Sequence, residues 1–415
     1  MNHLPPAVLP EIQSFAAYAI FLGSYLVFAL GKFPGMKIDR PGAAIIGAVL
    51  MVAFRIILPE NLLRWIDFRT IVLLFSMMLI VGYLRLAGFF EWITRLILTR
   101  LKPHHLLPMV IFTCGLLSAF FVNDIICLVM VPFVLSATRK LGMKPLPYLL
   151  AVATAANIGS VATITGNPQN MLIGTLSGIQ YSSFLAYLAP VAVAGLLLDW
   201  LVLHLAFAKA GLRDTVAEIT AAAPEANRTS FIKPGIVVLL VLAGFIAGVA
   251  PALMAALGAA MMLITRTRDP REAYDQVDWG VLVFFVGLFV IVGGAEKAGF
   301  LEHLGHFARI WDFKNPWIFT VLVASLSNLV SNVPAVMLLK TVVPGYTNPP
   351  LGWLILAMAS TLAGNLTITG SVANIIVVER AKPEVEIRFR DYFRVGLPVT
   401  VLTLGFGLGW LLLVR

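Results

Sequence analysis

Residues 163–170 read Thr-Ile-Thr-Gly-Asn-Pro-Gln-Asn, and residues 367–374 read Thr-Ile-Thr-Gly-Ser-Val-Ala-Asn. Each segment lies inside a long apolar stretch. Pro168 has no N–H and clashes with the preceding turn of a helix, so a helix should break there. Gly166 and Gly370 permit the backbone angles that a break requires. The freed backbone groups cannot face lipid. The pattern therefore predicts two broken helices whose polar loops line a cavity or are buried in protein.

These two segments belong to a longer internal repeat. Segment 67–92 resembles segment 278–303 at a spacing of 211 residues, with a shared Asp–aromatic pair and a shared Ala-Gly-Phe-x-Glu. Segment 117–123 resembles segment 326–332 at a spacing of 209, and the Thr-Ile-Thr-Gly pair follows at 204. Three matches in the same serial order predict two related halves.

The composition excludes a soluble globular protein. Of 415 residues, 60% are apolar and only 12% are charged, against about 25% charged in soluble proteins. The mean hydropathy is +0.92. Only helices and closed barrels satisfy the backbone in lipid, and the apolar runs are continuous rather than alternating. Cys114 and Cys127 lie in apolar segments, so no disulfide framework or metal site is indicated. The sequence predicts a polytopic helical membrane protein.

Apolar runs near the ~20 residues that a spanning helix needs predict ten crossings. They lie near 14–31, 42–58, 68–86, 147–174, 186–208, 234–249, 251–265, 279–296, 351–378 and 393–413. Two more apolar stretches, 104–138 and 316–339, have polar centres and are expected to enter and return as re-entrant hairpins.

The net charge of +9 is explained by Lys and Arg residues in the loops that are predicted to lie on the inner side of the membrane. With the N-terminus outside, the predicted inside loops carry 22 Lys and Arg and the outside segments carry 8. This asymmetry is typical of cytoplasmic loops, so nucleic acid is not an expected partner. We expect a multi-pass protein of the inner or plasma membrane with both termini outside.

Five crossings per half is an odd number, so the halves should have opposite orientations. The predicted fold is an all-α polytopic membrane protein, an inverted repeat of 5+5 transmembrane helices with one re-entrant hairpin and one broken helix per repeat. Residues 1–208 form the first repeat, 209–233 a cytoplasmic linker and 234–415 the second repeat. This architecture is typical of secondary transporters, which bind solute at the repeat interface.

Asp124 is the only carboxyl group expected deep in the membrane within the two clusters. An ionised Asp there costs about 2.5–3.5 kcal/mol, and burial favours the neutral form, so Asp124 could load and release a proton. The alternative is that its carboxylate caps a helix. The second half has Val333 at this position, so a proton site would be asymmetric.

Other polar residues in the spans are expected to pack helices together. This applies to the isolated Thr154 and Thr361. Asp199 and His204, in the last span of the first half, are also expected to serve in packing or at the interface.

The chain resembles the ion transporter superfamily, with a citrate-transporter-like domain, and is most similar to the branch of arsenite-efflux permeases and plant silicon-efflux transporters. The resemblance is carried by SAFFVNDIICLVMVPFVL at 118–135, AANIGSVATITGNPQNMLIG at 155–174 and AGNLTITGSVANIIVVERAK at 363–382. The more distant dicarboxylate/sodium symporters have Ser-Asn-Thr at both hairpin tips, where this chain has Val-Asn-Asp and Ser-Asn-Val.

The resemblance implies alternating access, with substrate between the hairpin tips and the broken-helix loops. It points to Asn123, Asp124, Asn157, Thr163, Gly166, Asn167, Asn170, Ser331, Asn332, Gly364, Asn365, Thr367, Gly370 and Asn374. Thr165 and Thr369 in the loops complete the candidate substrate-binding set, with Asp124 as the proton-coupling residue.

The predicted site holds no Lys, Arg or His. An ionised Asp124 ~5 Å from the solute would repel each negative charge by roughly 3 kcal/mol at an effective dielectric of ~20. A neutral oxyacid such as silicic or arsenous acid avoids this cost, so a proton-coupled exporter of a small oxyacid is predicted. The alternatives are a sodium-coupled symporter of organic or inorganic anions and a channel. No enzyme motif, cofactor or metal is indicated. One chain holds the whole site, so a homodimer is allowed but not required.

Overall fold

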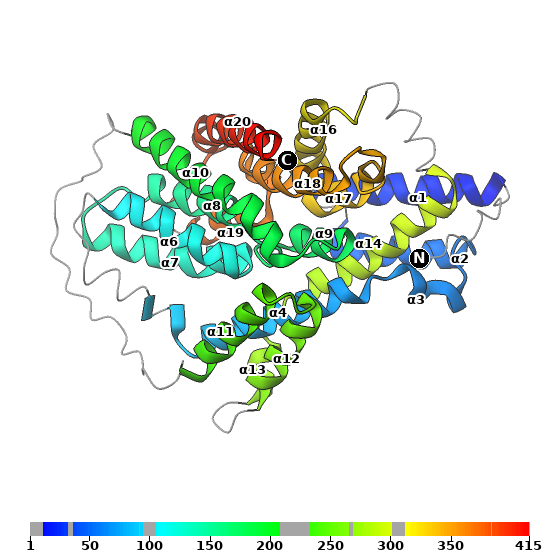
Figure 1. Ribbon diagram of the computed structural model, residues 1–415, viewed down its shortest axis with the longest axis horizontal. Helices are drawn as coiled ribbons and strands as arrows, with labels where there is room; N and C mark the ends of the chain where they lie inside the picture. Colours follow the sequence, from blue (N-terminus) through cyan, green and yellow to red (C-terminus); the bar gives the residue numbers. More distant parts are fainter. Residues whose placement is uncertain are drawn as a thin grey trace.

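The computed structural model describes residues 11–31, 36–90, 92–93, 105–207, 232–264, 269–300, 312–382 and 384–414. Within these ranges the protein is built from helices and has no strand (Figure 1). The predicted all-helical membrane fold is therefore confirmed. The predicted linker 209–233 lies almost entirely outside the described residues, and the domain limits stay predictions.

The helices follow the same order in the two halves. The first half has α1 (Glu11–Leu30), α2 (Arg40–Ala53), η1 (Pro59–Asn61), α3 (Leu62–Trp65), α4 (Phe68–Leu86), α6 (Leu106–Phe120), α7 (Asn123–Lys140), α8 (Leu146–Ser160), α9 (Pro168–Ser177) and α10 (Tyr181–Phe207). The second half has α11 (Ile232–Ile246), α12 (Pro251–Leu263), α13 (Pro270–Tyr274), α14 (Trp279–Lys297), α16 (Pro316–Val330), α17 (Asn332–Leu339), η5 (Val343–Gly345), α18 (Pro349–Leu362), η6 (Ala363–Asn365), η7 (Ile368–Gly370), α19 (Val372–Ala381) and α20 (Phe389–Leu413).

Among the described residues, five helices are long and apolar enough to cross a membrane: α1, α4, α10, α14 and α20. Helices α2, α11 and α12 are shorter than the predicted spans. The backbone takes positive φ at Arg55, just after α2, and at Gly248, between α11 and α12. Pro251 then begins α12, where its missing N–H is not needed. The count of ten crossings stays a prediction.

Both interrupted apolar stretches form pairs of packed helices. Phe121 and Val122 separate α6 from α7, and Ser331 alone separates α16 from α17. The first break precedes the predicted one, because Asn123 already belongs to α7. The helix pairs place Asn123 and Asn332 at the start of the second helix of each pair.

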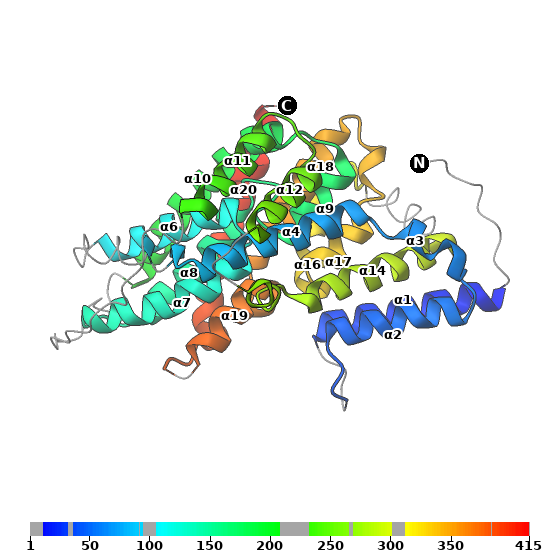
Figure 2. The same cartoon turned by 90° about the horizontal axis from the view of Figure 1, so that it is seen from below.

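The helices form two sets that pack mainly among themselves. Figure 2 shows α1, α2 and α14 of the first set side by side. We call α1, α2, α4, α11, α12 and α14 the frame helices, and α6–α10 with α16–α20 the site helices. The halves of the chain interlock in the frame, where α2 packs on α14 and α12 packs on α4. They interlock again in the second set, where α10 runs along α20 and α7 packs on α19.

Helices α6 and α8 cross closely at two glycines. A Cβ atom added to Gly159 would lie 2.0 Å from the carbonyl oxygen of Gly115. This close approach lets α8 carry its polar end beside α6.

We expect Gly159→Ala to lower the stability of the protein by about 1–3 kcal/mol, because the added methyl group overpacks the crossing. The matched control is Gly405→Ala on α20, where a Cβ meets nothing within 4 Å and Ala gains up to about 1 kcal/mol of helix propensity. The unfolding midpoints of the two variants in detergent micelles measure these changes in stability. Equal midpoints for the two variants would contradict this packing.

Candidate functional site

Both predicted helix breaks are present. Helix α8 ends at Ser160, and α9 begins at Pro168, as the proline rule requires. The Asn167 side-chain oxygen accepts the Asn170 backbone N–H at 2.9 Å and so caps α9. In the second half, two 3-10 turns, η6 and η7, separate α18 from α19.

The two loops are held by the same pair of hydrogen bonds, 204 residues apart. The Asn170 amide donates to the carbonyl oxygens of Ser160 and Thr163, at 3.1 and 3.0 Å. The Asn374 amide donates to those of Gly364 and Thr367, at 2.7 and 3.0 Å. These bonds satisfy carbonyl groups that the helix breaks leave open.

Asn157, on α8, joins the two loops and one hairpin tip. Its amide nitrogen donates to the side-chain oxygens of Asn365 and Asn374, both at 2.9 Å. Its oxygen accepts from the Asn123 amide at 3.1 Å and the Ser371 hydroxyl at 2.9 Å. An amide has two donor hydrogens and two acceptor sites, so Asn157 uses all its capacity.

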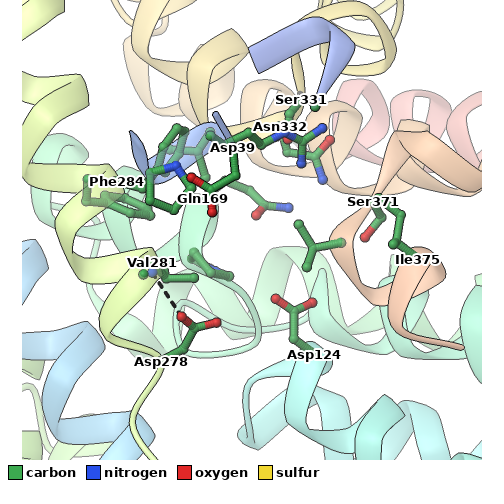
Figure 3. A pocket seen from close by; sticks show the side chains of 18 of the residues that line it. Asp39, Asp124, Gln169, Asp278, Val281, Phe284, Ser331, Asn332, Ser371 and Ile375 are labelled. Carbon is green, nitrogen blue, oxygen red and sulfur yellow. Dashed lines mark hydrogen bonds between the residues drawn. The ribbon is translucent and has the colours of Figure 1, made fainter. Parts of the chain in front are cut away.

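A cavity of about 700 Å³ lies between the frame helices and the site helices (Figure 3). The frame contributes the end of α1 and the starts of α2 and α14. The second set contributes the tips of α7 and α17, the start of α9, and the region from η7 to α19. The lining residues are Ala29, Leu30, Gly31, Asp39, Arg40, Pro41, Asn123, Asp124, Pro168, Gln169, Asp278, Gly280, Val281, Phe284, Phe285, Ser331, Asn332, Val333, Thr369, Ser371, Val372 and Ile375.

Three carboxyl groups point into this cavity from different sides (Figure 3). Asp124 comes from α7. Asp39 and Asp278 cap α2 and α14 by accepting the backbone N–H groups of Gly42 at 2.9 Å and Val281 at 3.0 Å. Asp39 and Asp278 were not predicted to belong to the site, and tertiary packing brings their two helix starts to the cavity. Both are exposed and lie outside the two polar clusters, so the expectation that Asp124 is the only deep carboxyl group within those clusters stays a prediction.

Asp124 itself does not cap its helix. The N-cap of α7 is Val122, and no side chain caps that end. Helix capping, the alternative weighed for Asp124, therefore does not account for its position, and its carboxyl group remains available to the cavity.

Arg40 also lines the cavity, so the expectation of a site without Lys, Arg or His is wrong. Its Nε donates to the Phe28 carbonyl oxygen at 3.0 Å, which ties the start of α2 to the end of α1. The cavity thus combines three carboxyl groups with one guanidinium group.

A family model described as a citrate transporter, CitMHS, matches residues 25–363. The chain belongs to the CitMHS citrate transporter family. It is therefore a multi-pass membrane transporter, and the predicted resemblance to the ion transporter superfamily is confirmed.

Curated relatives of this CitMHS protein match it along most of its length. It is 30% identical to a silicon efflux transporter of Oryza sativa subsp. japonica, over 97% of this chain and 98% of the relative. It is 26% identical to a Dictyostelium discoideum protein assigned as transporter arsB, over 90% and 87%. The solved YdaH transporter of Alcanivorax borkumensis has the same fold, with a TM-score of 0.58, 16% identity, and coverage of 97% and 96%.

The CitMHS chain brings five of the predicted site residues to the cavity surface: Asn123, Asp124, Ser331, Asn332 and Thr369. The other predicted residues build the loops behind that surface. They are Asn157, Thr163, Thr165, Gly166, Asn167, Asn170, Gly364, Asn365, Thr367, Gly370 and Asn374.

Besides Asp39, Arg40 and Asp278, two polar residues of the cavity were not predicted to belong to the site. They are Gln169 and Ser371, which line the cavity. Their position inside the two polar segments was the signal that could have identified them.

The Gln169 amide donates to the Thr361 hydroxyl at 3.2 Å, so Thr361 contacts a residue of the cavity wall, and its predicted role in helix packing stays a prediction. With its amide oriented to satisfy its neighbours, Asn332 accepts from Gln169 at 3.2 Å and donates to the Ser360 carbonyl oxygen at 3.0 Å.

Ser331 has a strained backbone at the tip of its hairpin. Its φ of 78° and ψ of 158° lie in a region that is essentially restricted to glycine. This conformation lets α16 stop and α17 start with one residue between them, and it directs Ser331 toward the cavity.

We expect Asn157→Asp to destabilise the protein by at least about 2 kcal/mol. An ionised Asp donates no hydrogen bond, so the Asn365 and Asn374 oxygens lose their donor, and each buried unsatisfied group costs about 1–3 kcal/mol. The control is Asn315→Asp, because Asn315 caps α16 with its oxygen and Asp caps equally well. Unfolding in detergent measures the difference, and similar midpoints for both variants would contradict the role of Asn157.

We expect Ser331→Gly to raise the unfolding midpoint. Relief of the backbone strain gains about 1–3 kcal/mol, which exceeds the entropic cost of glycine, about 0.5–1 kcal/mol. Ser331→Ala removes the same hydroxyl and keeps the strain, so it should give no such rise. If Ser331→Gly and Ser331→Ala lower the unfolding midpoint by the same amount, the backbone at Ser331 is not strained.

Proposed function

We propose that this transporter couples the movement of protons to the efflux of a small neutral or weakly acidic oxyacid, of the class of silicic acid and arsenite. Asp124 binds the coupling proton, and the cavity between the frame helices and the site helices binds the solute. The silicon efflux transporter among the relatives supports this substrate class.

The observation that carries the proposal is the hydrogen-bonding character of the cavity wall. The Asn123 amide nitrogen donates a hydrogen bond to the side-chain oxygen of Asn157. The Asn123 side-chain oxygen is buried and has no partner among the described residues. Asp124, the next residue in the chain, also lines the cavity and adds carboxyl oxygens to its wall (Figure 3). These groups accept hydrogen bonds, and a solute rich in O–H groups supplies the donors that such a wall needs.

The charges of the cavity also favour a neutral solute. Asp39, Asp124 and Asp278 face one Arg40, so the wall is negative when the carboxyl groups are ionised. One ionised carboxylate about 5 Å from an anion costs roughly 3 kcal/mol per negative charge at an effective dielectric of about 20. A neutral oxyacid does not carry this cost.

Alternating access is supported by a difference between two equivalent aspartates. Asp278 lines the open cavity. Its counterpart Asp67, 211 residues earlier, accepts the hydroxyl groups of Thr70 on α4 and Thr175 on α9, both at 2.8 Å. The start of α4 is therefore hydrogen-bonded to α9 through Asp67, whereas the start of α14, its counterpart in the second half, lines the open cavity. With the orientation proposed from the loop charges, the open side faces the cytoplasm, and the solute enters from there.

The second candidate function is sodium-coupled transport of citrate or another anion. Two observations favour it: the description of the family model, and the Arg40 guanidinium at the cavity. Arginine is suited to carboxylate binding because its planar fork can donate two parallel hydrogen bonds.

Flux into proteoliposomes under an imposed pH gradient tests the proposal. We expect proton-driven flux of silicic acid or arsenite without sodium, and a fall of at least about tenfold in Asp124→Asn, because a carboxamide carries no titratable proton.

The matched control is Asp275→Asn, which removes an exposed carboxylate outside the cavity and should keep the wild-type flux. Sodium-driven flux of citrate or succinate that is insensitive to Asp124→Asn would favour the second candidate and refute the first.

A further inference from the structure

A second carboxyl group is buried behind the binding loops. Asp199 lies on α10 with 0% of its surface exposed. One of its oxygens, Oδ2, is 3.0 Å from the hydroxyl oxygen of Thr154 on α8. The other, Oδ1, has no hydrogen-bond partner among the described residues. The sequence predicted a role for Asp199 in helix packing or at the membrane interface, but neither role explains a buried carboxyl group with one oxygen unpaired.

The hydrogen bonds of Thr154 indicate where a proton sits. A threonine hydroxyl has one hydrogen, yet the Thr154 oxygen is 2.9 Å from the Leu150 carbonyl oxygen and 3.0 Å from Asp199. If the hydroxyl donates to Leu150, Asp199 must supply the hydrogen between the two side chains. A protonated Asp199 satisfies both contacts, whereas an ionised one competes with Leu150 for a single hydrogen.

Among the described residues, no ion pair involves Asp199, and the two arginines of α20, Arg390 and Arg394, are exposed. The helices packed against α10 are α6, α8, α11, α18 and α20. The titratable groups near Asp199 are the Cys114 thiol on α6 and the Tyr392 hydroxyl on α20. Lys233, on α11, is engaged with the Ile264 carbonyl oxygen, and α18 carries no charged residue. An unpaired charge in such an interior costs several kcal/mol, roughly.

The same interface contains further unpaired polar atoms. The Tyr392 hydroxyl and the Thr400 hydroxyl, both on α20, are buried and have no partner among the described residues. Thr403, one turn after Thr400, packs beside Gly195, one turn before Asp199. The contact of α8, α10 and α20 therefore keeps spare hydrogen-bonding capacity next to an acid.

A chain of hydrogen bonds connects Asp199 to the cavity. The Thr154 carbonyl oxygen accepts from the Asn365 amide at 3.3 Å, and Asn365 accepts from Asn157 at 2.9 Å. Asn157 then accepts from Ser371 at 2.9 Å, and Ser371 lines the cavity. A shift of α8 against α10 would therefore reach the binding loops through this chain, whose central residue, Asn157, has no spare hydrogen-bonding capacity.

We infer that Asp199 is a second proton-binding residue of the transport cycle, protonated in the conformation seen here. It exchanges its proton with water when α8 and α10 separate: the O–H bond of Asp199 breaks, and water takes up the proton. This inference rests on the proposed proton coupling, and it adds a proton to the one carried by Asp124.

Infrared difference spectroscopy on the purified full-length protein tests the protonation directly. A protonated carboxyl group has a C=O band separate from that of carboxylates. We expect such a band at neutral pH that is lost in Asp199→Asn, is shifted in Thr154→Val because its hydrogen bond is removed, and is unchanged in Asp275→Asn. Absence of any band that responds to Asp199→Asn overturns the inference.

Transport by the same variants tests coupling. The number of protons moved per solute should fall by about one in Asp199→Asn, while Asp124→Asn removes a different proton. An unchanged proton-to-solute ratio in Asp199→Asn overturns the coupling role even if the band is present. Absence of proton-driven flux in the wild-type protein would instead refute the proposed function. The infrared measurement would still decide whether Asp199 is protonated.

Discussion

The arrangement of the site depends on the Asn157 amide, which binds four polar side chains in an interior where water cannot replace a lost hydrogen bond. Its partners come from one hairpin tip and from the loop region of the other half. The loops therefore take their shape only when both halves are packed together. Asn170 and Asn374 then satisfy the carbonyl groups that the broken helices leave open. The cavity is the space left between this bonded unit and the frame helices.

The loops are alike in the two halves, whereas the two acids that we assign to proton binding have no acidic counterpart in the second half. Asn170 and Asn374 make equivalent bonds, whereas Asp124 corresponds to Val333 in the second half. Asp199 similarly corresponds to Thr403, at the spacing of 204 residues. In the function that we propose, the first half alone supplies both proton-binding groups.

Local signals predicted the helix breaks well, because Pro168 and the glycines act on their own neighbourhood. The site was harder to predict where it depends on tertiary packing. Nothing in the sequence placed Asp39 or Asp278 in the site, and only the meeting of α2 with α14 brings them to the cavity. The short length of α2 and α12 also follows from packing and turns rather than hydropathy. The inverted orientation of the halves stays a prediction.

The most important step of the proposed function is that movement of the solute across the membrane is coupled to movement of protons. The most direct measurement is the pH inside sodium-free proteoliposomes, read with a trapped pH-sensitive dye, after a gradient of silicic acid or arsenite is imposed. The account predicts that the solute gradient alone moves protons and changes the internal pH, with no change in vesicles that lack the protein. Solute flux without proton movement, or proton movement that appears only with citrate and sodium, would contradict it.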